Sequence, residues 1–518
     1  MQRKSRLENS IINSSVSTII FILNIFIKFI LQGVFIHYLG AEYLGLKGLF
    51  TNILSMLSLA DLGIGTAIVF SLYKPLQLND IPQIKALVYL YKKIYNFIGI
   101  FVCLLGLTII PFLPLILGKN INIPNIYLIY LLFLMNSVFS YFLAYNRSLL
   151  NADQNGYLNI LNNFICLIIV TIGQILILAL TGNYILFLII QVVCTIASNI
   201  DISFRVKKRY KDVFDYPETI KLNNKTITTL KKNTIGNLSN KIGTVVVMGS
   251  DNILILLFVN LTAVGIYSNY TLIINSIGGI FNQLTGSITA SIGNVAVTDD
   301  EKTSVSIFFK HYFINFTLLY FSTISMILMI QPFINIWVGK FYLLDNITFA
   351  LIILNFVITM FRNTSLVFID AYGLAWIQRW KPIIESILNI VLSLVFLVIF
   401  NMGIKGVLLG TILSSLTFIS WYEPYIVLRY GVKEKFSAYI KVTVKYSLSL
   451  SLGILSIMPL IYLINADSIF GMTLRGIIGF IISLFIYFIF YLKTNEFQFI
   501  LYVVKQLKMR LKKQKVEN

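Results

Sequence analysis

Long apolar stretches alternate with short polar breaks along almost the whole chain. A helix needs about 20 consecutive apolar residues to cross the hydrocarbon core of a bilayer. The pattern therefore predicts an all-α, polytopic membrane protein with about 14 transmembrane helices, an even number that places both chain ends on one side. The spans are expected at residues 11–38, 45–72, 94–117, 124–147, 158–181, 184–205, 236–260, 264–295, 308–334, 346–372, 382–402, 405–429, 440–464 and 470–493.

The composition agrees with this pattern, since 57% of the residues are hydrophobic and only 12% are charged. Soluble domains carry about 25% charged residues. The three cysteines, Cys103, Cys166 and Cys194, lie in apolar stretches without metal-ligand or disulfide spacing. The chain also lacks the phosphate-binding loop of ATP motors and the nucleophile and zinc motifs of hydrolases. We therefore expect no cofactor, no metal and no enzymatic activity.

The net charge of +20 is distributed as membrane topology requires, and not as a nucleic-acid interface. Cytoplasmic loops of membrane proteins carry an excess of Lys and Arg. With a cytoplasmic N-terminus, the predicted inner segments hold 34 of these residues and the outer ones hold 5, among them Lys47 and Arg475. This asymmetry predicts a multi-pass protein of the cell membrane with both termini in the cytoplasm, and no nucleic-acid partner.

The two halves of the chain share short motifs in the same order. Segment 111–118 matches 332–339, segment 43–46 matches 263–266, and segment 153–156 matches 370–373, at offsets of 217 to 221 residues. The order and spacing of these matches indicate a six-span unit that is used twice. Because six is even, the two copies share an orientation, and we expect a pseudo-two-fold axis along the membrane normal.

This duplication divides the chain into five predicted parts. In the last part, Ile500, Val504, Leu507 and Leu511 recur at helical spacing among lysines, which predicts a helix on the inner membrane surface. The parts are an N-terminal six-helix lobe (1–205), a basic cytoplasmic linker (206–235), a C-terminal six-helix lobe (236–429), two further helices (430–493) and a basic amphipathic cytoplasmic tail (494–518).

Four ionisable residues lie well inside predicted spans, where charges are costly and usually functional. Lys28 and Asp61 belong to the first lobe, and Asp251 and Arg362 belong to the second. One interpretation is a structural ion pair between Lys28 and Asp61 and another between Arg362 and Asp251. Alternatively, the two aspartates bind a coupling proton or sodium ion, because burial can raise the pKa of a carboxyl by several units.

Several features together resemble the polysaccharide transporter branch of the multidrug/oligosaccharidyl-lipid/polysaccharide (MOP) exporter superfamily, which holds the Wzx-type flippases. These features are the 6+6+2 arrangement of spans, the turn and helix of residues 37–70 with its run LADLGIG, the basic linker and the basic tail. The resemblance covers nearly the whole chain. It implies two six-helix lobes around a central cationic cavity.

The resemblance also implies a function. That function is the export of undecaprenyl-diphosphate-linked oligosaccharide repeat units from the inner to the outer leaflet, by alternating access, for surface polysaccharide assembly. The implied partners are the lipid-linked oligosaccharide, the membrane lipids and the polysaccharide polymerase machinery. Because such a cargo carries a diphosphate, we expect Lys28 and Arg362 to bind it, with Arg147 as a further candidate near the cytoplasmic side.

Two other classes of function stay open at this point. A cation-coupled multidrug exporter of the same superfamily would favour acidic over basic residues in its cavity. A membrane polysaccharide polymerase or glycosyltransferase usually needs a sizeable outer loop with catalytic acids, and the predicted outer loops are short.

Overall fold

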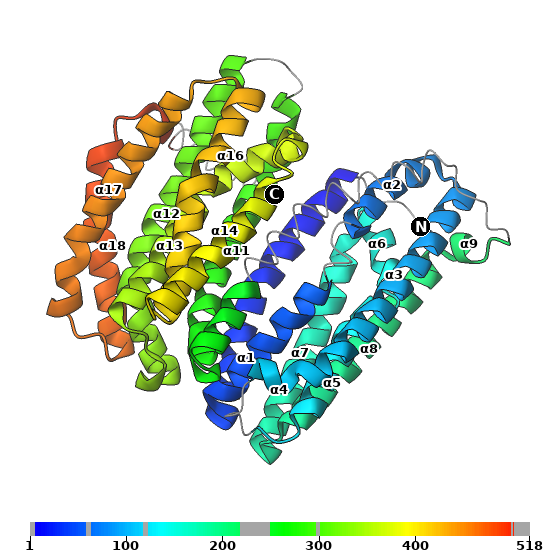
Figure 1. The fold of residues 1–518 in the computed structure, drawn as a ribbon. Helices are drawn as coiled ribbons and strands as arrows, with labels where there is room; N and C mark the ends of the chain where they lie inside the picture. The colour runs from blue at the N-terminus through cyan, green and yellow to red at the C-terminus, as the bar shows by residue number, and fades with distance from the viewer. Residues whose placement is uncertain are drawn as a thin grey trace, which may run out of the picture. The chain divides into compact units, whose positions relative to one another are not determined.

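The computed structural model describes residues 6–58, 64–117, 123–217, 249–296, 301–498 and 501, and these residues form helices and turns without any strand (Figure 1). Ten described helices are long and apolar enough to cross a membrane, or eleven if the bent pair α5 and α6 forms one span. The prediction of a multi-pass helical membrane protein is therefore confirmed.

The described residues fold into a series of helices. They are α1 (Arg6–Leu57), α2 (Ile64–Leu78), α3 (Ile81–Ile109), η2 (Ile110–Phe112), α4 (Leu113–Leu117), α5 (Ile126–Tyr141), α6 (Tyr145–Ala152), α7 (Gly156–Thr181), α8 (Tyr184–Arg209), α9 (Lys211–Phe214), the short helix Gly249–Phe258, α11 (Leu261–Ala296), α12 (Glu301–Val338), η3 (Lys340–Tyr342), α13 (Asn346–Ala371), η4 (Leu374–Trp376), α14 (Lys381–Leu394), η5 (Val395–Ile399), α15 (Ile404–Ser414), η6 (Ser415–Ile419), α16 (Ser420–Ile426), η7 (Val427–Val432), α17 (Phe436–Leu463) and α18 (Ile469–Tyr491).

Helix α1 consists of two helices joined at Gly40. Its 52 residues would extend for about 78 Å as one straight helix, far more than the hydrocarbon core of about 30 Å. Gly40 interrupts it with φ at 79°, a left-handed conformation that glycine adopts at little cost. The sequence predicts a turn between the first two spans at this place, and the break confirms it.

The predicted span 124–147 is wrong in one respect, because the structure divides it into α5 and α6, which meet at 44°. No proline or glycine marks the break. The end of α5 leaves carbonyl groups without helical partners. The side-chain amide of Asn199 on α8 donates to two of these carbonyls, those of Phe139 (2.8 Å) and Phe142 (3.1 Å). A contact between distant helices therefore stabilises the break.

By its internal contacts the chain forms two compact units. The first contains Met1–Ser268 and Arg379–Ile390, and the second contains Asn269–Gln378 and Val391–Asn518. These units differ from the predicted lobes, because α11 and α14 each contribute to both units. The predicted linker is described only as far as residue 217, and most of the tail 494–518 lies outside the described residues. The predicted lobe boundaries and the role of the tail therefore stay predictions.

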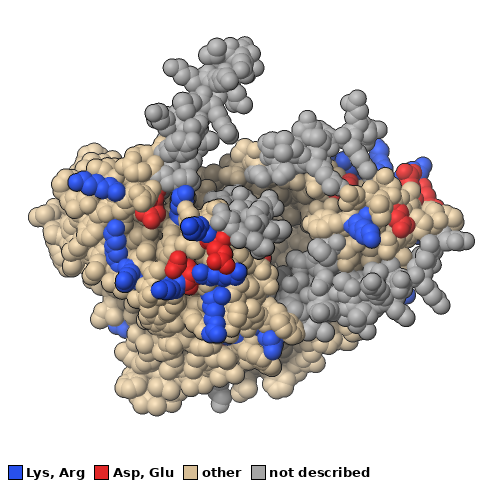
Figure 2. Space-filling view, turned by 90° about the horizontal axis from the view of Figure 1, so that it is seen from above, with Lys and Arg blue, Asp and Glu red and all other residues tan. Residues whose placement is uncertain are grey.

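In the first unit α7 packs against α1 and α8, and α5 packs along α8 (Figure 1). Asn13 on α1 fixes the start of α7, since its side chain accepts from the amide of Tyr157 (2.7 Å) and donates to the carbonyl of Gln154 (2.9 Å). Figure 2 shows basic and acidic side chains together at the right, on the end of this unit that carries α9. The topology prediction assigns this end to the cytoplasm.

Two glycines of the first unit bring α1 and α11 into backbone contact. A Cβ atom added to Gly45 would lie 2.2 Å from the carbonyl oxygen of Leu261, and one added to Gly265 would lie 2.0 Å from that of Ala41. The contacts are reciprocal, since each glycine faces the residue four positions before the other. Small residues allow membrane helices to approach this closely. The matched segments 43–46 and 263–266 thus meet in space.

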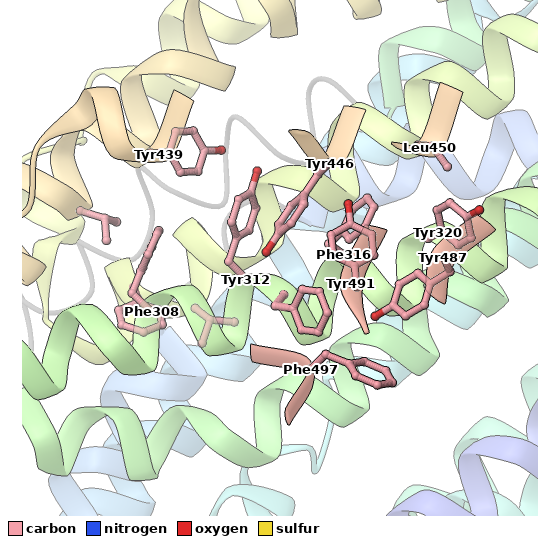
Figure 3. Packing of buried hydrophobic residues seen from close by; sticks show 14 of the residues in the cluster. Phe308, Tyr312, Phe316, Tyr320, Tyr439, Tyr446, Leu450, Tyr487, Tyr491 and Phe497 are labelled. Carbon is pink, nitrogen blue, oxygen red and sulfur yellow. The ribbon is translucent and has the colours of Figure 1, made fainter. Parts of the chain in front are cut away.

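In the second unit α12 is covered by α17 and α18, the two helices expected outside the repeat. Figure 3 shows the aromatic side chains that fill the space between these helices. The rings of Phe316 and Tyr446 stack with centroids 4.2 Å apart, and Tyr487 and Tyr491 on α18 close the layer from the other side. Aromatic pairs of this kind add to the packing energy of the helices.

Helix α12 continues through Pro332. Proline has no amide hydrogen, so the carbonyl of Leu328, four residues earlier, loses its helical partner. Arg475 on α18 replaces that partner, because its Nε and Nη2 donate to the Leu328 carbonyl at 3.0 and 2.6 Å. Arg475 is buried. Arg475, which the sequence analysis counts among the outer charges, therefore acts as a donor inside the helix bundle.

We expect Arg475→Met to lower the free energy of unfolding by about 1–3 kcal/mol, because the buried Leu328 carbonyl then has no donor. In a Pro332→Ala background, the amide of the new alanine is available to that carbonyl, so the same change should cost less. A double-mutant cycle on the purified protein, measured by denaturant unfolding in detergent, gives the coupling energy. Equal costs in the two backgrounds would contradict this account of Arg475.

Candidate functional site

A cavity of about 430 Å³ lies within the first unit, and we call it the basic cavity. Among the described residues that line it are two cations, Lys47 and Arg147, and no aspartate or glutamate. The other polar lining groups are amides, hydroxyls and thiols. The lining consists of Leu31, Lys47, Ser140, Arg147, Asn163, Cys166, Leu167, Val170, Gln174, Phe187, Gln191, Cys194, Thr195, Ser198 and Asn199.

Helices α7 and α8 form two walls of the basic cavity. Their lining residues recur every three or four positions, which places them on one face of each helix. At a rise of 1.5 Å per residue, the lining extends for about 16 Å along α7, from Asn163 to Gln174. The cavity is therefore elongated along these helices.

Arg147, on the first turn of α6, occupies one end of the basic cavity. Its guanidinium donates to four neutral side-chain oxygens, those of Asn163 (2.7 Å), Ser198 (2.9 Å), Asn162 (3.0 Å) and Asn199 (3.1 Å). Among the described residues, no carboxylate lies within ion-pair distance of it. Asp201 is linked to Arg147 through Asn162 (2.8 Å) and pairs with Arg205 instead. The charge of Arg147 therefore acts on the cavity.

Lys47 occupies the opposite end. Its Nζ lies 5.2 Å from the ring centroid of Phe35, and that ring meets the ring of Phe187 edge-on at 5.4 Å. Lys47 lies on α1 seven residues after Gly40, about 10 Å along the helix, and its predicted place on the outer side stays a prediction. The signal available in the sequence is a lysine at the start of the predicted apolar span 45–72.

The structure also places the remaining predicted charges of the first unit. Lys28 is exposed on α1 and is not among the described lining residues of the basic cavity. Leu31, one turn further along α1, does line it. Asp61 lies outside the described residues, so its pairing with Lys28 and its ion-coupling role stay predictions. Asp251 is buried on the short helix Gly249–Phe258, whose first residue lies against Met56 of α1. Ion coupling at Asp251 likewise stays a prediction.

Arg362, expected to bind cargo, forms a bidentate ion pair with Glu423 on α16. Its Nε and Nη2 each lie 2.9 Å from a carboxylate oxygen. The Glu423 side chain is fully buried and that of Arg362 is 11% exposed. The ion-pair interpretation of Arg362 therefore holds with Glu423 as the acid, in place of the Asp251 expected from the sequence. The overlooked signal is a carboxylate inside the predicted span 405–429, where charges are costly.

The second unit contains a larger cavity of about 1010 Å³, which we call the apolar groove because most of its lining is hydrophobic. Along α17 its lining extends from Tyr439 to Tyr462, about 35 Å at helical rise and close to the thickness of a bilayer core. Both arginines in its lining have partners, Arg362 in Glu423 and Arg475 in the Leu328 carbonyl. The groove therefore offers mainly apolar surface.

No protein-family model matches the chain, and no curated protein matches it. Solved structures do share its fold. The lipid II flippase MurJ in an inward closed conformation is 17% identical over 92% of this chain and 98% of that chain, with a TM-score of 0.62. An inward-facing MATE multidrug resistance transporter of the MOP superfamily is 12% identical over 76% of this chain and 93% of its own, with a TM-score of 0.56.

A third similar structure is a MOP superfamily transporter from Pyrococcus furiosus, whose binding pocket is described as having reverse polarity. It is 11% identical over 82% of this chain and 97% of that chain, with a TM-score of 0.56. At these identities the likeness shows the fold alone. The chain is thus a multi-pass membrane protein with the fold of MOP superfamily transporters, a fold shared by exporters and flippases.

Proposed function

We propose that this protein exports an undecaprenyl-diphosphate-linked oligosaccharide repeat unit from the inner to the outer leaflet, for surface polysaccharide assembly. The observation that carries the proposal is the basic cavity, whose described lining holds Lys47 and Arg147 but no carboxylate. The resemblance of the sequence to polysaccharide transporters and the fold shared with the lipid II flippase MurJ support the same cargo class.

The charge of the cavity favours an anionic cargo over a cationic drug. One lysine or arginine at contact distance from a phosphate contributes about 4 kcal/mol at an effective dielectric near 20. The same charges repel a cationic drug by a comparable amount. The amides of the lining add donors and acceptors for phosphate oxygens and sugar hydroxyls.

The apolar groove suits the polyprenyl tail of such a cargo. A tail that leaves the lipid for the groove gains no hydrophobic energy, since both surroundings are apolar, and it is held by packing alone. The groove is about as long as the bilayer core is thick. The membrane potential favours the outward step, because each negative charge that leaves an inside-negative cell releases about 2.3 kcal/mol per 100 mV.

The test is a deletion strain complemented with the wild-type chain or with the Lys47→Gln/Arg147→Gln double variant. Surface polysaccharide is measured with an antibody, and lipid-linked oligosaccharide by extraction and mass spectrometry. We expect the deletion and the double variant to lose surface polymer while complete repeat units accumulate on lipid at the inner leaflet. Normal polysaccharide with new sensitivity to cationic drugs would contradict the proposal, as would unpolymerised units accessible at the outer surface, which a missing polymerase would produce.

A further inference from the structure

We propose that Lys47 and Arg147 form two separate anion sites along the basic cavity, which the diphosphate of the cargo occupies one after the other. This inference rests on the proposed function and adds the position and order of its binding sites. It assigns a binding role to Lys47, and it places two sites inside one unit, where the sequence predicted cations from both lobes, Lys28 and Arg362.

The two cations lie beside different parts of α8. Arg147 bonds to Asn163 and Asn199, whereas Lys47 lies beside the aromatic pair of Phe35 and Phe187. Phe187 and Asn199 are twelve residues apart on α8, or about 18 Å at helical rise. Each cation therefore acts mainly on its own part of the cavity.

The Arg147 site is preformed. The neutral oxygens of three asparagines and a serine hold the guanidinium in place without cancelling its charge. A planar guanidinium can donate to two phosphate oxygens side by side. To do so, its N–H groups exchange their hydrogen bonds with the neighbouring oxygens for hydrogen bonds with the anion. Because the start of α7 lies on the predicted cytoplasmic side, this site would meet the cargo first.

The Lys47 site has amides as its neighbours. Gln174 donates to the carbonyl of Phe187 (3.2 Å) and to the side chain of Gln191 (3.4 Å), and both amides line the cavity at this end. A lysine is a compact charge on a flexible stem, so it can follow an anion over a short distance. This site lies toward the outer side in the predicted topology and would therefore receive the diphosphate second.

Cysteine labelling makes the two sites measurable one at a time. Cys166 lines the cavity one turn after Asn163 and, with Cys103 and Cys194 changed to serine, reports on the Arg147 end. A Gln191→Cys variant in a chain without Cys103, Cys166 and Cys194 (all changed to serine) reports on the Lys47 end. The reagents are methanethiosulfonates with an anionic sulfonatoethyl, a cationic trimethylammonioethyl or a neutral methyl group. Each forms a mixed disulfide with the cysteine thiolate and releases methanesulfinate.

The measured quantity is the anionic-to-cationic rate ratio on the purified full-length protein, with the neutral reagent as a control for folding and access. We expect Arg147→Gln to lower the ratio about tenfold at Cys166 and to leave it unchanged at the Gln191→Cys position. Lys47→Gln should lower the ratio at the Gln191→Cys position and leave it unchanged at Cys166. Arg147→Lys, which keeps the charge, should preserve the ratio at Cys166. Inorganic diphosphate should slow labelling at both positions when both cations are present. It should slow labelling only at the Gln191→Cys position in the Arg147→Gln variant and only at Cys166 in the Lys47→Gln variant.

Equal losses at both positions in either variant would show a single merged site and overturn the proposal. Unchanged ratios in both variants would show that neither cation binds anions. The labelling does not depend on export. If each variant lowers the ratio only at its own position but the deletion strain makes normal polysaccharide, the two anion sites stand and the proposed cargo is rejected. If the deletion strain traps repeat units but the variants do not show this position-specific loss, the proposed function stands and the two sites are rejected.

Discussion

Glu423→Gln is expected to lower the free energy of unfolding by about 3–5 kcal/mol, because it leaves the buried charge of Arg362 without its bidentate carboxylate. The measurement is denaturant unfolding of the purified protein in detergent. The matched control is Glu301→Gln, which breaks an ion pair with Lys433 of similar length, 2.7 Å, whose side chains are 60% and 61% exposed. That change should cost at most about 1 kcal/mol, because water solvates both charges.

The double variant Arg362→Met/Glu423→Met removes the whole ion pair, whereas Glu423→Gln leaves the buried charge of Arg362 without a partner. Replacing both partners of a buried ion pair by apolar residues is often neutral for stability. We therefore expect the double variant to recover most of the stability that Glu423→Gln loses. A Glu423→Gln protein as stable as the Glu301→Gln protein would contradict the structural role of the pair, and it would make Arg362 a cargo-binding candidate again.

Gly45→Ala and Gly265→Ala are each expected to destabilise the protein by about 1–3 kcal/mol or more, because the added methyl group overlaps a backbone carbonyl at 2.0–2.2 Å. A carbonyl of a helix cannot rotate aside, so α1 and α11 must separate. The measurement is the yield of folded protein and its unfolding midpoint. The double variant should cost less than the sum of the two, since the first separation also makes room for the second methyl group.

Gly278→Ala on the same helix α11 is the control. A Cβ there meets only the Met360 side chain, at an ordinary 3.8 Å. This change should be neutral or stabilise by up to about 1 kcal/mol, because alanine favours helix over glycine. If Gly45→Ala behaved like Gly278→Ala, the close approach of the two repeat segments would not contribute to stability.

The helices can be predicted from the sequence because each apolar span must satisfy its own backbone inside a membrane. The apolar pattern predicts a span at residues 158–181, and α7 is Gly156–Thr181. It also predicts a turn that contains Gly40, and Gly40 breaks α1. The break between α5 and α6 could not be predicted, because no breaker residue marks it and Asn199, more than fifty residues away, satisfies the carbonyls that it exposes.

The candidate site was predicted only in part. The sequence indicates that charges inside spans matter, and it points to Arg147 and Arg362. Apolar periodicity shows that a charge lies in a span, but it does not show which atoms face that charge. Glu423 sits sixty-one residues from Arg362 and neutralises it, whereas Arg147 is surrounded by neutral amides.

The sequence by itself determined the membrane class, the places of spans such as 158–181 and the internal match between segments 43–46 and 263–266. These properties follow from local apolarity and from offsets along the chain. Only the tertiary structure decided which cations act on a cavity, because the field at each charge depends on partners from other helices. It placed Lys47 with Arg147, committed Arg475 to the carbonyl left free by a proline, and paired Arg362 with a buried carboxylate.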